Sequence, residues 1–328
     1  MIVVTGAAGF IGSCIVARLN ERGQENLLLV DHFEDDNLKK IADIKRENLK
    51  NKKFVEFIDK KDFIERITND KLKVKVDCLI HMGACSSTIL QDAQYFEENN
   101  FEYTLRLCRW ALKHNIRFIY ASSAATYGDG GFGYQDNEDT IRHCQPLNLY
   151  GQSKQKFDLW VLDNHATDKI VGLKFFNVYG PNEYHKAEMQ SVAAKNYERV
   201  IKDGKIKLFK SYKKEYKDGE QKRDFIYVKD AVEIIEFFID HPRINGIFNA
   251  GTGQAQTWND LAKALFRAAG KPLSIEYMDM PEVLRPRYQY FTQANMLKLR
   301  TAGYNNQFRN LEQGIGDYVS YLKNHSYW

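Results

Sequence analysis

The sequence IVVTGAAGFIG at residues 2–12 joins a short apolar run to a stretch typical of a helix. Gly6, Gly9 and Gly12 allow a tight turn there and let backbone N–H groups and a helix N-terminus approach a pyrophosphate closely. The spacing is one residue longer than the G-x-G-x-x-G dinucleotide fingerprint, so a glycine-rich turn without a ligand is the alternative. Asp31, about 20 positions on at the end of the next apolar run, favours dinucleotide binding.

Apolar and β-branched runs alternate with longer amphipathic stretches through the first half of the chain, as in βαβ units around a parallel sheet. We expect strands at residues 2–5, 27–31, 54–58, 78–82, 118–122 and 171–176, and a solvated helix and loop at 32–53. A further strand and turn is expected at 246–253, followed by a helix at 257–269. The predicted fold is α/β, a Rossmann-type doubly wound parallel sheet with a smaller mixed α/β substrate domain.

The predicted domains interleave along the chain. The dinucleotide-binding domain comprises residues 1–176, joined by about 225–270, which return to it. The substrate-binding domain comprises residues 177–224 and 271–328, where the regular alternation loosens and long insertions occur.

Composition and charge exclude several classes of protein. The 47 Lys and Arg residues nearly balance the 43 Asp and Glu residues, and a formal net charge of +4 does not indicate a nucleic-acid partner. The five cysteines contain no C-x-x-C pair, which argues against a disulfide framework and a zinc site and favours a reducing compartment. No apolar run reaches the length of a membrane span. We therefore expect a cytoplasmic protein with no metal, nucleic acid or membrane partner.

Tyr150 and Lys154 are four positions apart and share one face of a predicted helix. An ammonium group beside a phenol favours the phenolate, which can take a hydroxyl proton while hydride leaves the same carbon. This spacing also arises by chance. Ser123 supports the interpretation, because it ends the fifth predicted strand and would face the start of that helix to hold the substrate oxygen. A hydroxyl that caps local backbone is the alternative for Ser123.

These motifs, with SSAATYG at 122–128 and FNVYGP at 176–181, resemble the extended short-chain dehydrogenase/reductase family in the family's order. HMGACSST at 81–88, HK at 185–186, KRDFIYV at 222–228 and RYQYFTQ at 287–293 are similar to members that invert carbon 6 of the heptose in ADP-D-glycero-D-manno-heptose, in lipopolysaccharide core synthesis. The resemblance implies transient oxidation to a 6-keto intermediate and hydride return from bound NADPH. It also suggests a homo-oligomer, with a pentamer as one state.

Site residues are carried over from the family position by position. The implied catalytic residues are Ser123, Tyr150, Lys154 and Lys186, with Lys186 as a second acid/base. The implied cofactor contacts are Gly6, Gly9, Phe10, Ile11, Gly12, Asp31, His32, Lys39, Lys53, Met82, Gly83, Ala84, Cys85, Ser86, Asn99, Lys154, Val178 and Lys186. The implied substrate contacts are Ser123, Asn177, Glu188, Lys195, Phe209, Lys210, Ser211, Tyr212, Arg223 and Tyr288. His32, Met82, Glu188 and Lys195 depart from the family pattern, and the loop at 211–221 is longer.

The sequence leaves two cofactors open. Asp31 by itself favours NAD, because its carboxylate would accept hydrogen bonds from the adenosine ribose. Lys39, Lys40, Lys52 and Lys53 lie close in sequence and could neutralise a 2′-phosphate, or could be solvated surface charges. With the family resemblance, NADP is the prediction and NAD the alternative.

Two other functions compete with the epimerase. The first is another nucleotide-sugar enzyme of the same superfamily. A 4-epimerase would differ from the predicted enzyme mainly in its sugar and nucleotide contacts. A 4,6-dehydratase is disfavoured because it needs an acid and a base just after Ser123, where Ala124 and Ala125 can carry no proton. A regulator that senses the dinucleotide without catalysis is the other. It is disfavoured because the chain keeps Ser123, Tyr150 and Lys154.

Overall fold

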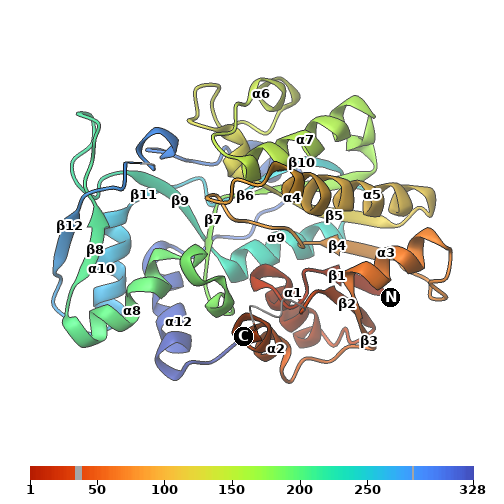
Figure 1. Cartoon of the computed structure of the whole chain (residues 1–328), viewed down its shortest axis with the longest axis horizontal. Coiled ribbons are helices and arrows are strands. Elements are labelled where there is room, and N and C mark those ends of the chain that lie inside the picture. The colour runs from red at the N-terminus through yellow and green to blue at the C-terminus, as the bar shows by residue number, and fades with distance from the viewer. Residues whose placement is uncertain (34–38, 283) are drawn as a thin grey trace.

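The computed structural model describes residues 1–33, 39–282 and 284–328. In this part of the chain seven strands form one sheet, in the order β10-β6-β5-β4-β1-β2-β3 (Figure 1). They are β1 (Ile2–Thr5), β2 (Leu27–Asp31), β3 (Glu56–Asp59), β4 (Cys78–His81), β5 (Arg117–Ser123), β6 (Ile170–Phe175) and β10 (Gly246–Ala250), all in parallel pairs. The order reverses between β1 and β4, where a doubly wound sheet opens a ligand crevice. The predicted fold class is confirmed.

The strands expected from the sequence are present within one or two residues of their expected bounds. The largest difference is at β3, which begins at Glu56, two residues later than expected; Phe54 and Val55 before it are exposed. The expected strand at 246–253 is β10, which extends the sheet beside β6. Within the charged segment 32–53, α2 (Lys39–Leu49) is a helix, and residues 34–38 lie outside the described residues.

Helices cover both faces of the sheet. The side chains of Ile2 and Val4 in β1 pack with α1 (Phe10–Glu21) and α9 (Val228–Asp240), whereas Val3 packs with α3 (Lys60–Thr68), α5 (Tyr103–Lys113) and α7 (Leu149–Asp163). Successive strand residues point to opposite faces, so both faces of β1 need a cover. The carboxyl ends of the strands form the free edge on which a site can be built.

A second group of elements lies on the left of Figure 1. The strands β7 (Asn177–Tyr179), β9 (Lys222–Tyr227) and β11 (Ala255–Thr257) pair in one small sheet, and β8 (Ile206–Phe209) pairs with β12 (Ile275–Met278). The helices α8 (Val192–Asp203), α10 (Trp258–Ala268) and α12 (Leu311–Asn324) pack on one another. The shorter elements are α4 (Ala93–Phe96), η2 (Glu97–Glu102), η3 (Ala124–Tyr127), α6 (Glu138–His143), η4 (Ala166–Asp168), η5 (Tyr184–Met189), η6 (Arg285–Arg287) and α11 (Leu297–Thr301).

The segment expected to return to the first domain, 225–270, contains elements that pack in different places. α9 and β10 lie with the seven strands, but α10 packs against α8 and α12. Its apolar face causes this, since Leu261 and Leu265 are buried in that contact. The division into two domains, with residues 225–270 returning to the first, stays a prediction. No helix in the described ranges is both long and apolar enough to cross a membrane.

We predict that Gly12→Ala lowers the free energy of unfolding by about 1–3 kcal/mol, as overpacking of a tight contact does. A Cβ at residue 12 would lie 2.0 Å from the carbonyl oxygen of Gly6. The matched control is Gly316→Ala within α12, where a Cβ meets no described atom within 4 Å and a gain of about 0.5–1 kcal/mol is expected. Urea unfolding measures both. An unchanged midpoint for Gly12→Ala would show that α1 does not depend on this contact.

Candidate active site

The turn between β1 and α1 contains glycines because two pieces of backbone meet there. Gly6 has a φ of +67°, and a Cβ on it would lie 2.6 Å from the backbone nitrogen of Gly83. Gly9 is the N-cap of α1, and no described side chain forms a capping hydrogen bond at this end. The N–H groups of the first turn, at residues 10–12, lack partners within the helix and, with the helix dipole, favour an anion.

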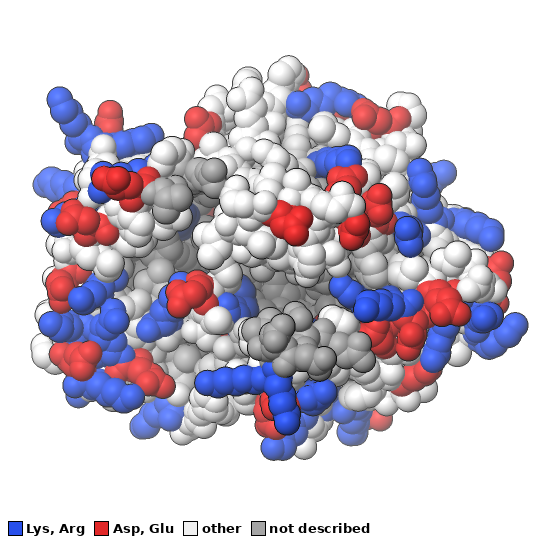
Figure 2. Space-filling model, viewed as in Figure 1, with Lys and Arg blue, Asp and Glu red and all other residues white. Residues whose placement is uncertain are grey.

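A cavity of about 270 Å³ lies beside this turn, at the carboxyl ends of β1, β2 and β4. The predicted cofactor residues that line it are Gly6, Asp31, His32, Gly83, Ala84, Cys85 and Asn99. The sequence interpretation missed Thr5, Val30, Phe33, Ile41, Ala42, Lys45, Lys60, Tyr95 and Tyr103, which also line it. Phe10, Ile11 and Gly12 begin α1, Met82 and Ser86 flank the lining segment, and Val178 lies in β7. Figure 2 shows that this face of the molecule is hollowed between its two parts.

Asp31 connects β2 to the glycine turn. Its Oδ2 atom accepts a hydrogen bond from the backbone N–H of Ala8 at 2.8 Å, and its Oδ1 atom accepts one from the backbone N–H of His32 at 2.7 Å. The Nζ atom of Lys45 in α2 lies 2.5 Å from the same Oδ1 atom. A positive charge thus stands at the place where the ribose of a dinucleotide is expected.

Lys39 and Lys53, which were assigned to the cofactor from the sequence, are not among the described residues that line the cavity. Lys39 is exposed at the start of α2, and Lys53 forms an exposed ion pair with Glu25 at 2.5 Å. Lys60 at the start of α3 lines the cavity instead, and its Nζ atom donates to Asn99 Oδ1 at 2.9 Å. Burial lowers the pKa of Lys60. The packing of α3 on the sheet, which no local pattern predicts, places Lys60 in the lining of the cavity.

Tyr150, Ser123 and Lys154 come together where α7 packs on β5. Asn148 caps α7 by accepting a hydrogen bond from the Gly151 N–H at 2.8 Å, which places Tyr150 in the first turn. Burial raises the pKa of the Tyr150 phenol, and a hydrogen bond with the Ser123 side chain lowers it. Burial lowers the pKa of Lys154 to about 8. The arrangement is that of a proton-transfer group with an ammonium one helical turn away.

Asn100 joins these residues to the cavity. Its Nδ2 atom donates to Ser153 Oγ in α7 and to the Cys85 carbonyl oxygen, both at 2.9 Å, and its Oδ1 atom accepts from the Cys85 N–H. Asn100 belongs to η2, a π-helical turn, a feature frequent at functional sites. The sequence interpretation singled out Asn99 and missed Asn100; the adjacent asparagines were the available signal.

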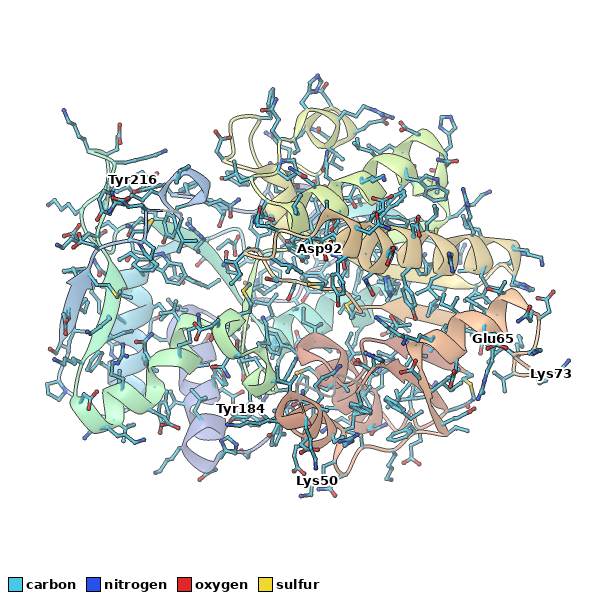
Figure 3. All side chains as sticks on the ribbon, in the orientation of Figure 1. Lys50, Glu65, Lys73, Asp92, Tyr184 and Tyr216 are labelled. Carbon is cyan, nitrogen blue, oxygen red and sulfur yellow. The ribbon has the colours of Figure 1, made fainter. Side chains whose placement is uncertain are left out.

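Lys186 lies on η5, beside the glycine turn. Its Nζ atom is 5.0 Å from the centre of the Phe10 ring in α1. Burial lowers the pKa of Lys186, and the carboxylate of Glu183 opposes this. Glu183 holds the loop, because it accepts hydrogen bonds from the N–H and hydroxyl of Ser191 at 2.6 and 2.7 Å. Tyr184, labelled in Figure 3, donates to the carbonyl oxygens of residues 321 and 326 and fixes η5 to the C-terminal segment.

Arg223 on β9 is a buried cation with aromatic neighbours. Only 6 % of the residue is exposed, and its guanidinium lies 5.0 Å from the Tyr288 ring centre and 5.7 Å from that of Trp258. Among the described residues no carboxylate pairs with it, and burial lowers its pKa. A guanidinium in this state can bind two phosphate oxygens at once. Trp258, which donates to the Tyr288 hydroxyl at 2.8 Å, was missed in the sequence.

The other predicted substrate residues lie around this group. Asn177 begins β7, and Glu188 and Lys195 lie 3.7 Å apart near the surface. Phe209 ends β8, and Lys210, Ser211 and Tyr212 lead into the loop that carries Tyr216, labelled in Figure 3. Phe209 contacts the Tyr288 ring edge to face, and Tyr212 is exposed and donates to Asp279. No described group of three or more His, Cys, Asp or Glu residues is arranged to hold a metal ion.

Comparisons with known proteins show what the chain is similar to. Two relatives named ADP-L-glycero-D-manno-heptose-6-epimerase, from Nitratidesulfovibrio vulgaris and Fusobacterium nucleatum, are 48% and 44% identical, each over 97% of both chains. The structure of the enzyme of that name from Helicobacter pylori superposes with a TM-score of 0.80 at 27% identity, over 98% of this chain and 96% of the other. Thermus thermophilus UDP-glucose 4-epimerase in complex with NAD superposes with a TM-score of 0.75 at 28% identity, over 98% of each chain. Residues 2–251 match the model of the NAD dependent epimerase/dehydratase family, and the chain belongs to this family.

Proposed function

We propose that the protein is an epimerase that inverts carbon 6 of the heptose in ADP-D-glycero-D-manno-heptose and gives ADP-L-glycero-D-manno-heptose. The observation that carries the proposal is the meeting of Ser123, Tyr150 and Lys154 next to the glycine-turn cavity, to which Asn100 connects them. The relatives that bear this activity in their names match nearly the whole chain.

Tyr150 takes the proton of the hydroxyl group on carbon 6. The Lys154 ammonium, one helical turn away, favours the phenolate, and Ser123 holds the substrate oxygen next to the phenol. When bound, a nicotinamide dinucleotide would accept a hydride from carbon 6 and return it from the same side. Loss of the proton and the hydride leaves a 6-keto group.

Inversion requires the 6-keto carbon to present its other face. Carbon 6 is exocyclic, so rotation about its bond to the sugar ring carries the carbonyl oxygen away from Tyr150. A second proton donor is needed where that oxygen arrives. Lys186 beside Phe10 lies at the glycine turn, and burial lowers the pKa of its ammonium, which favours proton transfer near neutral pH. We assign Lys186 this second acid/base role.

The substrate diphosphate is assigned to Arg223. Its guanidinium is buried without a carboxylate partner among the described residues and faces the rings of Tyr288 and Trp258. An unpaired buried cation is costly unless an anion binds there. Glu188 and Lys195 are two predicted substrate contacts whose residue types depart from the family pattern. Their side chains pair with each other, and we expect the sugar contacts at these two positions to differ from that pattern.

The residues around the cavity fit a nicotinamide dinucleotide, and we propose NADP. Gly6 and Gly12 let the backbone of the turn pack closely on its neighbours, and the N–H groups at the start of α1 favour a pyrophosphate beside it. Lys45 neutralises Asp31, which would otherwise repel a 2′-phosphate, and Lys60 brings a second cation to the same cavity. NAD is the alternative.

The remaining parts of the proposal concern the cellular setting. All five cysteines are free thiols, which supports a reducing cytoplasmic location. The activity belongs to lipopolysaccharide core synthesis, with a small ADP-sugar as substrate and no nucleic-acid or membrane partner. We also propose that the protein forms a homo-oligomer, with a pentamer as the suggested state.

The parent protein is expected to interconvert the two ADP-heptose epimers, followed by NMR at carbon 6, and to leave UDP-glucose unchanged. Tyr150→Phe should slow epimerisation by about 10²- to 10⁴-fold, because it removes a positioned acid/base group. Tyr277→Phe, far away on β12, is the matched control and should keep the parent rate. Near-parent epimerisation by Tyr150→Phe would remove this residue from the mechanism, and conversion of UDP-glucose alone would replace the proposed substrate.

Lys186→Met is expected to separate the two halves of the reaction. One epimer should still reduce the bound cofactor through Tyr150, whereas net inversion should fall by about 10²-fold or more because the second donor is gone. Absorbance of the reduced cofactor and NMR at carbon 6 measure the two steps. Lys202→Met, an exposed lysine paired with Glu198 in α8, is the control. Inversion at the parent rate would mean that Tyr150 serves both faces.

Lys60→Met is expected to reduce the preference for NADP over NAD by about ten- to a hundredfold, the effect of losing one charged hydrogen bond to phosphate. Calorimetric titration of cofactor-free protein with each dinucleotide measures the preference without substrate. Lys53→Met, which removes the exposed partner of Glu25, should leave it unchanged. If Lys53→Met reduced the preference for NADP and Lys60→Met did not, Lys53, the lysine assigned from the sequence, would recognise the 2′-phosphate.

A further inference from the structure

A charged pair lies directly behind the catalytic residues, inside the protein. The Nζ atom of Lys174 in β6 is 2.5 Å from the Oδ2 atom of Asp158 in α7, and both side chains are 0% exposed. Asp158 also accepts hydrogen bonds from the hydroxyls of Tyr120 at 2.8 Å and Ser122 at 2.6 Å. Lys174 donates to the Thr126 hydroxyl at 2.8 Å. Both charges are thus paired, and the pair is neutral as a unit.

Asp158 attaches α7 to β5 in a fixed register. Tyr120 and Ser122 of β5 both reach its carboxylate. The carbonyl oxygen of Ala121, between them, accepts a hydrogen bond from Lys154 Nζ at 2.8 Å. Lys154 and Asp158 are one helical turn apart and project from the same face of α7. Three successive residues of β5 therefore meet one face of the catalytic helix.

This register also decides where the catalytic phenol lies. Ser123 is the next residue of β5, and its side chain shares a hydrogen bond with Tyr150 at the start of α7. A slip of the helix along the strand would separate the two. Packing alone does not require charges here, because apolar residues of similar volume often replace a buried ion pair without loss of stability. The charges of Asp158 and Lys174 therefore point to a role beyond packing.

We propose that the Asp158–Lys174 pair is a positioning and charge-balancing element of the active site. Asp158 holds α7 on β5 beside Lys154, and Lys174 cancels the charge of Asp158, so that neither charge alone controls the protons of Lys154 and Tyr150. The inference rests on the proposed function for its link to catalysis.

The titratable groups that face this cluster come from every element packed against it. Besides Asp158, Lys174 and Lys154, they are His81 of β4, Cys85 after β4, Cys108 of α5, Tyr120 of β5, Tyr127 of η3, Cys144 after α6, Tyr150 of α7, and Asp136 and Lys298, which interact with Lys174. Burial and the charge of Lys154 lower the pKa of His81, so it stays neutral near pH 7. Of these groups, the Asp158 carboxylate acts on the pKa of Lys154, and Lys174 is the cation paired with that carboxylate.

Removing either charge should act on both catalytic groups with the same sign. Burial lowers the pKa of Lys154 to about 8, and the Asp158 carboxylate opposes this. Burial raises the pKa of Tyr150, and Asp158 adds to that rise. Without Lys174, the carboxylate would raise both pKa values further. Without Asp158, the Lys174 ammonium would lower both. Removal of both charges should return them toward the parent values.

The experiment uses Lys174→Gln, Asp158→Asn and the double variant, which keep hydrogen-bonding groups. In protein labelled with ¹³C at lysine Cε, the resonance lost in Lys154→Met identifies Lys154. We expect its pKa to rise by about one unit in Lys174→Gln, to fall by about one unit in Asp158→Asn, and to return in the double variant. Ser122→Ala is the matched control. It removes a neutral hydrogen bond from Asp158 and should lower the unfolding temperature without moving the Lys154 titration.

The pH profile of epimerisation should move with the same signs, to higher pH in Lys174→Gln and to lower pH in Asp158→Asn. The NMR titration needs no substrate, so it tests the pair even if the parent protein fails to convert the ADP-heptose. Shifts of the same sign in both single variants, no shift in either, or failure of both to fold would overturn the proposal. So would an unmoved pH profile in active variants whose Lys154 titration has shifted.

Discussion

The close approach of two backbones at the glycine turn is the contact on which the rest of the structure depends. A Cβ at Gly12 would lie 2.0 Å from the Gly6 carbonyl oxygen, and one at Gly6 would lie 2.6 Å from the Gly83 nitrogen. Without these carbons, α1 begins directly beside the end of β1, and the segment after β4 passes alongside. The N-terminus of α1 is thereby held beside the cavity, where its N–H groups favour a phosphate.

The same turn holds parts of the site that are distant in the sequence. Asn48 of α2 donates hydrogen bonds to the carbonyl oxygens of Ala8, in the turn, and Asn182, in the loop that leads to Lys186. Asn100 attaches the segment after β4 to α7. The two proposed acid/base groups therefore belong to separate elements that are fixed to one frame, which a reaction on both faces of a carbon requires.

The positive charge of the site comes from a few buried cations and not from the overall charge of the chain. The net charge of the chain is only +4, and positive and negative side chains are interspersed on the face in Figure 2. Yet burial lowers the pKa of Lys60, Lys154, Lys186 and Arg223. Positive charge held away from water acts on a ligand more strongly than the same charge at the surface. Buried positive charge of this kind favours ligands that carry phosphate groups, as the proposed cofactor and the proposed ADP-sugar do.

The sequence by itself determined the parallel sheet, the glycine turn at its ligand edge and the shared helix face of Tyr150 and Lys154. These features are local, because strand alternation, turn chemistry and the four-residue helical spacing act between near neighbours. Only the tertiary structure decided that Lys60 and not Lys53 faces the cavity, and that the charge of Lys174 is buried against α7. Those outcomes depend on the register at which each helix packs on the sheet, and contacts between residues far apart in the chain, which a local pattern does not encode, set that register.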